Sequence, residues 1–187
     1  MADNKVLYGL KNCYYAVLNN GTYSAPVALE GAKSITLSPE GDKSTNYADN
    51  VPYFVINANN GYSGTLTLMN VPESFYTDVL GFKTDSKGDI VETADAIGKE
   101  CALLFQFEGD VKAKRWIFYD VVFARPNIEG NTKEDTIEPS SIALEFTAMP
   151  IVNGDDTIVK KFTTEATDSA EYSAWFTTAP TMPTFGE

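Results

Sequence analysis

The sequence predicts a mainly β domain, a sandwich or partly closed barrel of antiparallel strands with one short α-helix flanking it. Apolar and polar residues alternate along many short segments, which is the period-two pattern of half-buried strands. Turn signals rich in glycine, asparagine and proline separate these segments. A helix pattern in the first half is confined to one stretch, residues 72–80. Together these three observations favour a sheet-based architecture.

Length and composition fit a single domain spanning residues 1–187. The chain has 187 residues, of which 43% are hydrophobic, so it can bury about 70% of its unfolded surface. No apolar run approaches the ~20 residues that a membrane helix needs. The first residues, Met1–Lys5, lack the basic and apolar regions of a secretory signal. We therefore expect neither a membrane anchor nor a secretory signal.

The first half of the chain contains four strand candidates. A strand over residues 12–18 should end at the turn Asn19–Asn20–Gly21, because Asn-Gly favours the positive φ angles of tight hairpins. Shorter strands are expected at 26–29 and 34–37. Residues 62–70 alternate clearly between apolar and polar side chains. These segments predict hairpin-connected antiparallel strands.

The expected helix covers residues 72–80 and has signals at both ends. Pro72 suits the first turn, Glu73 favours the positive N-terminal end, and Gly81 supplies a left-handed C-terminal cap. Its apolar stripe would consist of Phe75, Val79 and Leu80, or of Tyr76 and Leu80. The helix should therefore pack one face against the sheet.

The second half repeats the strand pattern. Residues 101–108 and 115–124 should form a hairpin, and residues 141–148 should form a strand with Leu144 and Phe146 facing inward. Turns or loops are expected at 85–89, 127–139 and Asn153–Gly154, the last leading into a strand at 157–163. A second short helix is favoured at 169–176, before an extended C-terminal segment at 177–187.

Residues 42–56 fit none of these patterns. The segment contains too many large apolar groups for a solvated loop and too many polar groups for a core strand. Such a segment is typical of an arm that becomes ordered on a partner. The alternative is a local hairpin that covers the protein's own core.

Charge and residue usage exclude several functions. The net charge of −12 repels polyanions, so sequence-specific nucleic-acid binding is not expected, and we interpret Lys112, Lys114 and Arg115 as solvated charges beside a hairpin. Histidine is absent, which removes His-based triads and metal sites, and no phosphate-binding loop is present. We therefore expect no enzyme activity, no metal and no cofactor.

Two isolated features have structural interpretations. Cys13 and Cys101 lie far apart within strand patterns, so we interpret them as buried, reduced hydrophobes. Asp120 is the one acid inside a strongly apolar strand, where a satisfied or outward-facing carboxylate is favoured over a catalytic one. A carboxylate hydrolase would require a pair of acids across a cleft, and the sequence gives no motif for it.

A series of short segments runs through nearly the whole chain. The pieces, in order, are Leu7–Asn12 with Tyr15–Ala16, Gly31–Ile35, Tyr47–Asn50, Gly61–Gly64, Val79–Gly81, Ala102–Phe105, Tyr119 with Arg125–Pro126, and Trp175–Phe176. In this order and at this chain length, they resemble the major tail tube protein of long-tailed (siphovirus-type) bacteriophages that infect Gram-positive hosts.

This resemblance implies a tail-tube-like fold and a structural role in the virion tail, with the protein made in the host bacterial cytoplasm. Subunits would form stacked hexameric rings whose inner sheets join into a barrel around a lumen. The implied partners are other copies of the chain, the tape-measure protein in the lumen, and the tail terminator and tail-tip proteins at the ends. DNA would pass through without specific binding.

The resemblance and the residue patterns suggest three sets of site residues. The inter-subunit arm at 42–56 would use Tyr47, Asp49, Asn50, Tyr53 and Phe54. A C-terminal patch of Tyr172, Trp175 and Phe176 would serve either core packing or docking between subunits. Alternation makes Glu108, Asp120 and Glu145 candidates for acidic groups that face the lumen.

One further function class stays open from the sequence. A non-catalytic β-sandwich could instead be a ligand-binding or adhesion module, for example for carbohydrate. Such modules usually expose tryptophan or tyrosine platforms and carry an export signal. Here Trp116 lies in a core-like strand and no such signal is visible, so the tube subunit is the favoured interpretation.

Overall fold

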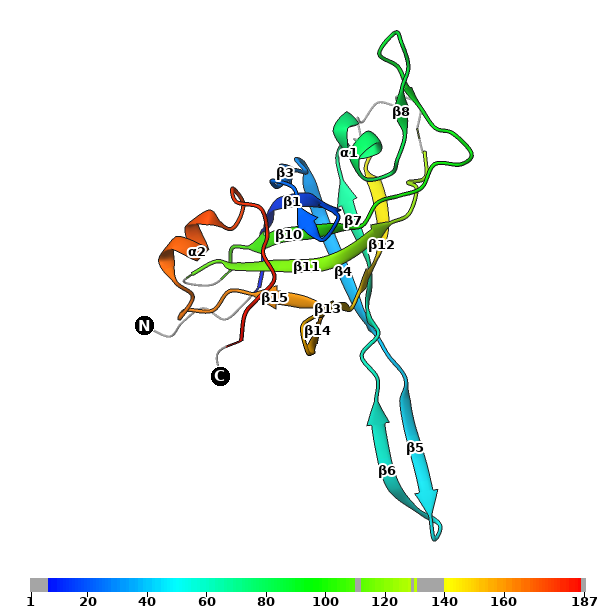
Figure 1. The fold of residues 1–187 in the computed structure, drawn as a ribbon, viewed down its shortest axis with the longest axis vertical. Coiled ribbons are helices and arrows are strands. Elements are labelled where there is room, and N and C mark those ends of the chain that lie inside the picture. Colours follow the sequence, from blue (N-terminus) through cyan, green and yellow to red (C-terminus); the bar gives the residue numbers. More distant parts are fainter. Residues whose placement is uncertain (1–6, 110–111, 129, 131–139, 186–187) are drawn as a thin grey trace, which may run out of the picture.

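Nine of the strands described by the computed structural model form one antiparallel sheet (Figure 1). The structure describes residues 7–109, 112–128, 130 and 140–185. The sheet strands are β1 (Leu10–Asn19), β2 (Thr22–Tyr23), β3 (Val27–Ala28), β4 (Ala32–Glu40), β7 (Gly61–Leu68), β10 (Cys101–Phe107), β11 (Lys114–Phe123), β12 (Ile142–Met149) and β15 (Lys160–Phe162). The predicted mainly β, antiparallel fold is therefore confirmed.

The strand order is β2-β1-β10-β11-β12-β7-β4, with β3 paired to β1. β11 changes partner along its length, because Trp116 to Phe118 pair with β15 whereas Asp120 to Phe123 pair with β12. At the far end of the order, β4 also comes close to β1 without pairing with it. The sheet therefore curls, and its concave side encloses a core.

Three two-stranded hairpins lie outside this sheet. They are β5 (Lys43–Ala48) with β6 (Val51–Asn57), β8 (Lys83–Thr84) with β9 (Ile90–Val91), and β13 (Ile151–Asn153) with β14 (Asp156–Ile158). The expected turns at 85–89 and Asn153–Gly154 are the tips of the last two. The segment expected as one strand at 157–163 is divided between β14 and β15. Most of the expected loop at 127–139 lies outside the described residues.

The concave core contains apolar side chains from both halves of the chain. Phe75, Val79 and Leu80, one of the two predicted helix stripes, are all buried there beside Tyr15 and Phe118. Phe75 meets Tyr15 edge-on, with ring centroids 5.3 Å apart. Burial of a large aromatic side chain stabilises a fold by about 1.5–3 kcal/mol. Helix α1 (Glu73–Asp78) is thus fixed to the sheet by its apolar face.

A second, smaller core lies on the opposite face of β1, β10 and β11. It contains Ala16, Leu104, Ile117, Tyr119 and Trp175 among its buried members. Helix α2 (Ser169–Ala174) and the segment after it cover this face. The second helix expected at 169–176 is therefore present, and the central strands are covered on both faces.

The turn and cap residues explain where the elements end. Asn20 and Gly21 both have positive φ, +48° and +80°, as the Asn-Gly prediction requires. Pro72 occupies the N-cap of α1 rather than its first turn, because the helix begins at Glu73. Asp168 caps α2 by accepting hydrogen bonds from the backbone N–H groups of Ala170 and Glu171, at 2.8 and 3.2 Å.

Both cysteines are buried and unbonded, as predicted. Burial raises the pKa of the Cys13 thiol to about 12, and it raises the pKa of the Cys101 thiol as well. The thiols therefore stay protonated and behave as small hydrophobes. Among the described residues, no helix has the length and apolar character to cross a membrane.

Candidate assembly surfaces

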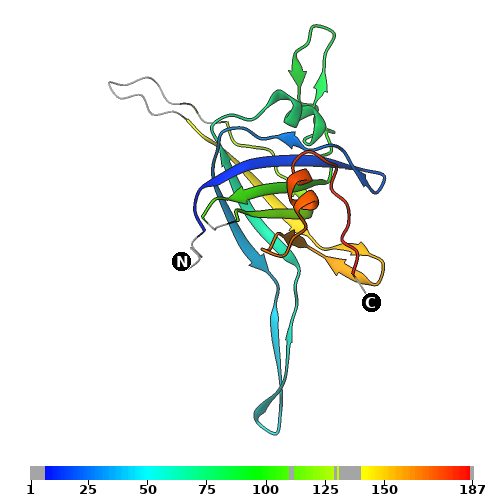
Figure 2. The ribbon, with the colours of Figure 1, turned by 90° about the vertical axis from the view of Figure 1, so that its left-hand side faces the viewer.

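The β5–β6 hairpin leaves the sheet as an extension of β4 and β7 and points away from the core (Figures 1 and 2). At its base, the Ala58 N–H donates to the Asp42 carbonyl at 3.0 Å and the Asn60 N–H donates to the Glu40 carbonyl at 2.9 Å. In the described part of the chain, β5 and β6 pack extensively only on each other. The hairpin is therefore attached to the sheet at one end and projects away from it.

Asp49 and Asn50 form the tip of this hairpin. Both have positive φ, +52° and +64°, which asparagine and aspartate tolerate better than other residues with a side chain. The predicted arm residues Tyr47 and Tyr53 lie in β5 and β6, and Phe54 is exposed. The segment is thus a regular hairpin, although its sequence shows no core pattern. The alternative in which it covers its own core is wrong, because the hairpin extends outward (Figure 1).

A bulge places two exposed apolar side chains on one face of the hairpin. Val51 pairs with Ala48 and Phe54 pairs with Asn46, with the register shift between these two pairs. Positions 48 and 46 lie two apart on β5 and share a face, so the positions paired with them, Val51 and Phe54, lie on that same face of the hairpin. Their side chains are 55% and 56% exposed. The hairpin therefore carries an apolar face of its own.

The outer face of β12, β7 and β4 is polar. A hollow on this face is lined by the hydroxyl and carboxylate groups of Thr36, Ser38, Ser63, Thr65, Glu145 and Thr147, and also by apolar side chains that include Phe123, Phe146 and Met149. Glu145 is exposed because its strand neighbours Leu144 and Phe146 point into the core. Glu108 is exposed too, but it lies beyond the end of β10, ion-paired with Lys11, and does not line this hollow.

The prediction that Asp120 faces outward is wrong. Its side chain is only 9% exposed, because β11 is covered on one face by the main core and on the other by α2 and the C-terminal segment. Among the described atoms, its Oδ1 has no hydrogen-bond partner. Burial, and to a lesser extent the charge of Glu100, raises the pKa of Asp120 to about 6.

The C-terminal patch packs on its own sheet. Trp175 is 8% exposed, and Phe176 stacks on Tyr14 with ring centroids 5.0 Å apart. The Tyr172 hydroxyl donates to the Ala113 carbonyl at 2.9 Å. Trp175 therefore belongs to the second core and Phe176 packs against it, whereas Tyr172 is only partly buried; docking of this patch on another subunit stays a prediction.

The basic cluster is partly buried rather than solvated, which corrects the prediction. The Arg115 guanidinium carbon lies 3.7 Å from the centroid of the Tyr172 ring and 4.9 Å from that of Phe176. The Lys112 ammonium donates to the Thr167 carbonyl at 2.9 Å. Two of the three basic residues therefore fix the α2 region to the β10–β11 hairpin.

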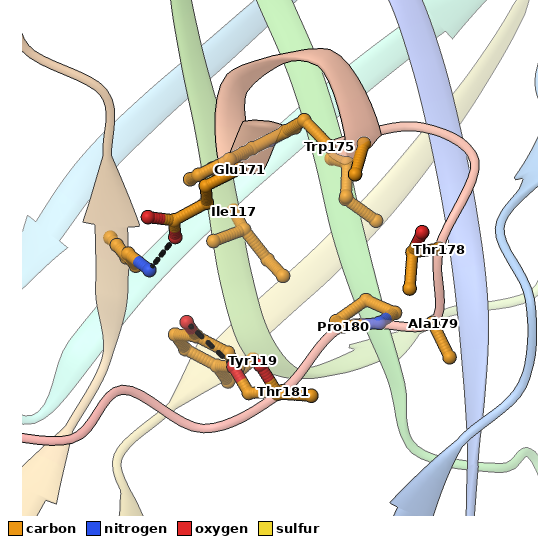
Figure 3. Close-up of a pocket in the computed structure, with 11 residues that line it drawn as sticks. Ile117, Tyr119, Glu171, Trp175, Thr178, Ala179, Pro180 and Thr181 are labelled. Carbon is orange, nitrogen blue, oxygen red and sulfur yellow. Dashed lines mark hydrogen bonds and ion pairs between the residues drawn. The ribbon is translucent and has the colours of Figure 1, made fainter. Parts of the chain in front are cut away.

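A small cavity lies beneath the C-terminal segment (Figure 3). Its volume is about 140 Å³, and its lining includes Ile117, Tyr119, Trp175 and Pro180. The Tyr119 hydroxyl donates to the Thr181 carbonyl at 3.4 Å. Ordinary ligand pockets have volumes of roughly 300–1,000 Å³. In the residues that the structure describes, no group of three or more metal-ligating side chains is present.

No protein-family profile and no curated protein matches the sequence. Among solved structures, the chain is similar to one in the cryo-EM structure of the anti-feeding prophage (AFP) baseplate, 6-fold symmetrised. The match covers 87% of this chain and 97% of that chain, at 10% sequence identity and a TM-score of 0.45.

Proposed function

We propose that the chain is a non-catalytic structural subunit of a phage-type tail tube, which assembles into stacked hexameric rings. The order of its segments resembles that of tail tube proteins. The observation that carries the proposal is the β5–β6 hairpin, which extends from the sheet into solvent (Figure 1).

A solvent-exposed hairpin of this kind needs a partner. An isolated two-stranded hairpin is marginally stable in water, because it lacks a third strand or a packed face. This one also exposes Val51 and Phe54 together. Aromatic and aliphatic anchors of this kind dominate interface energies. Contact with a neighbouring subunit would bury these side chains and stabilise the hairpin.

The sheet itself has an open end. Within the described residues, β4 pairs only with β7 and is the last strand of the order. An unpaired strand edge favours association with another strand. In a closed ring, each subunit's sheet would meet the next, and the exposed edge would be removed. Ring closure would thus protect the unpaired edge of β4, as a helix or loop packed over the edge does in other proteins.

The polar outer face suits the wall of a channel. The face carrying Glu145 presents hydroxyl groups and a carboxylate, and none of the described residues that line its hollow is a lysine or an arginine. Together with the net charge of −12, such a wall would repel phosphate and let DNA pass without sticking. In this proposal the tape-measure protein would occupy the lumen before ejection, and terminator and tip proteins would cover the tube ends.

Electron microscopy of concentrated protein tests the proposal. We expect six-fold rings or tubes from the natural chain. The informative variant replaces residues 46–54 by Asn-Gly, because this joins the paired residues Thr45 and Val55 through a two-residue turn. The shortened chain should stay folded, as judged by circular dichroism, and lose tube formation. Unchanged tube yield from the shortened chain would remove the main support for the proposal.

A further inference from the structure

The last described part of the chain, residues 179–185, crosses the second core and then reaches the β13–β14 hairpin (Figure 2). Two side chains donate hydrogen bonds to it. The Tyr119 hydroxyl lies 3.4 Å from the Thr181 carbonyl oxygen, which is long for a bond of this kind. The Asn153 amide donates to the Pro183 carbonyl at 2.8 Å, a usual distance. Asn153 is therefore the stronger polar attachment of this segment.

Asn153 is followed by Gly154, and an asparagine before a glycine can lose its amide spontaneously. The Gly154 backbone nitrogen attacks the side-chain carbonyl carbon of Asn153, ammonia leaves, and a cyclic succinimide forms. Water then opens the ring and gives aspartate or isoaspartate. Glycine favours the ring closure because it has no Cβ to hinder the approach. The reaction consumes one water molecule, releases one ammonia and needs no other reagent.

The chain contains the Asn-Gly pair three times, in different surroundings. At the pair 60–61, Gly61 is buried, and its N–H donates to the Asn59 side chain at 3.2 Å. A Cβ on Gly61 would lie 2.0 Å from the Ala148 carbonyl oxygen, so this backbone is tightly packed. Gly21 and Gly154 are instead exposed, with open space around them. Ring closure is thus hindered at position 60 and sterically open at positions 20 and 153.

Positions 20 and 153 differ in what the asparagine side chain holds. Asn20 is exposed at a hairpin tip, and within the described residues its side chain makes no hydrogen bond. Asn153 is half-buried, and its Nδ2 is engaged by the Pro183 carbonyl. Ring closure expels this same nitrogen, so the hydrogen bond must break for the reaction to proceed. The bound C-terminal segment therefore protects Asn153, and its local opening exposes the residue to reaction.

The product cannot restore the contact. An amide nitrogen donates hydrogen bonds, whereas an ionised carboxylate only accepts them. A carboxylate at position 153 would direct its negative charge at the Pro183 carbonyl oxygen, which is itself an acceptor. The segment would lose its attachment and meet a repulsive group in its place. Because the ammonia is lost, the change is not reversed when the segment closes again.

We propose that Asn153 is a deamidation site whose modification releases residues 179–185 from the β13–β14 hairpin. The segment shields Asn153 while it is bound, and a single modification then prevents its return. The pair Asn153–Gly154 thus acts as a slow, one-way release of the C-terminal segment. This device lies within one chain and does not depend on how copies of the chain assemble.

Peptide mass spectrometry after incubation at mildly alkaline pH measures the modification rate at each pair. In the natural chain we expect the fastest reaction at Asn20, a slower one at Asn153 and the slowest at Asn60. Met182 packs against the second core, so Met182→Ser should weaken the segment and raise the rate at Asn153 about fivefold, with Asn20 unchanged. Equal rates at Asn20 and Asn153 in the natural chain would overturn the protection. No reaction at Asn153 in either chain would overturn the site.

Limited proteolysis with subtilisin tests the release itself. Asn153→Asp creates one of the two products directly, and cleavage within residues 179–185 should become about fivefold faster than in the natural chain. Asn153→Ala removes the donor without adding charge and should speed cleavage less. Asn20→Asp makes the same change at the other open Asn-Gly pair and should match the natural chain. Cleavage of Asn153→Asp at the rate of Asn20→Asp would overturn the release.

Discussion

The Arg115 guanidinium lies over the Tyr172 ring, 3.7 Å from its centroid, and donates a hydrogen bond to the Tyr172 carbonyl. Its Nε also donates to the Gln106 side chain at 3.1 Å. One side chain of β11 thus connects a neighbouring strand with α2, which is 57 residues further along the chain. The contact fixes the C-terminal region on the outer face of the sheet.

Replacing Arg115 by Met should destabilise the protein by about 2 kcal/mol. The variant loses the cation–π contact and charge-assisted hydrogen bonds, and it leaves the Tyr172 carbonyl without this donor. Urea unfolding measures the effect as a lower midpoint at unchanged slope. Lys33→Met is the control, because Lys33 is exposed on β4. Equal midpoints for the two variants would contradict the role given to Arg115.

Trp175→Ala should cost about 3–5 kcal/mol, the usual range for truncating a buried aromatic side chain. Trp175 belongs to the second core beside Leu104 and Ile117. Its loss should also release the segment after α2, so limited proteolysis should cleave the variant near residues 176–185 faster than the natural chain. Phe185→Ala, at an exposed position, should leave both readouts unchanged. Protection of the segment in the variant would show that other contacts hold it.

The sequence predicted strands well where one face of the sheet meets solvent. On β12, the alternation of Leu144, Glu145 and Phe146 gives the observed inward and outward sides. On β11 the same rule fails, because five successive residues from Ile117 to Val121 are all buried. Alternation cannot assign a face to Asp120 when α2 covers what would otherwise be the solvent side.

Assembly features were partly predictable. Residues 42–56 stood out because they fit no core pattern, and the Asp49–Asn50 pair contains a signal for a tight turn, since both residues tolerate positive φ. The Arg115–Tyr172 contact has no such signal, because it depends on how α2 packs on a strand far away in sequence.

Asp120→Asn should stabilise the protein above pH 6, by about 1–3 kcal/mol, since it removes a buried charge that lacks a full set of partners. The folded-state pKa of Asp120 is raised to about 6, mainly by burial, so the folded chain binds a proton that the unfolded chain has released between pH 4 and 6. The natural chain therefore loses stability as pH rises through this window.

The difference between the two unfolding free energies should thus be largest above pH 6 and shrink toward pH 4. Denaturant unfolding of both chains at several pH values measures it, and the other titrating groups cancel in the difference. Thr147→Val changes an exposed side chain on β12 that carries no titrating group, and its difference from the natural chain should stay flat over the same range. A flat difference for Asp120→Asn as well would mean that the buried carboxylate does not titrate in this window.

Gly61→Ala should destabilise the fold where the β5–β6 hairpin returns to the sheet. Gly61 begins β7 with φ of +99°, and a Cβ there would lie 2.0 Å from the Ala148 carbonyl oxygen. Gly88 has a similar φ of +95° but open space around it, so Gly88→Ala isolates the backbone strain. We expect about 1 kcal/mol for Gly88→Ala and at least about 2 kcal/mol more for Gly61→Ala, measured by urea unfolding. Equal losses of unfolding free energy in the two variants would contradict this reason. They would mean that the β7–β12 pairing shifts to make room for the methyl group, so that the nearby Ala148 carbonyl does not require glycine at position 61.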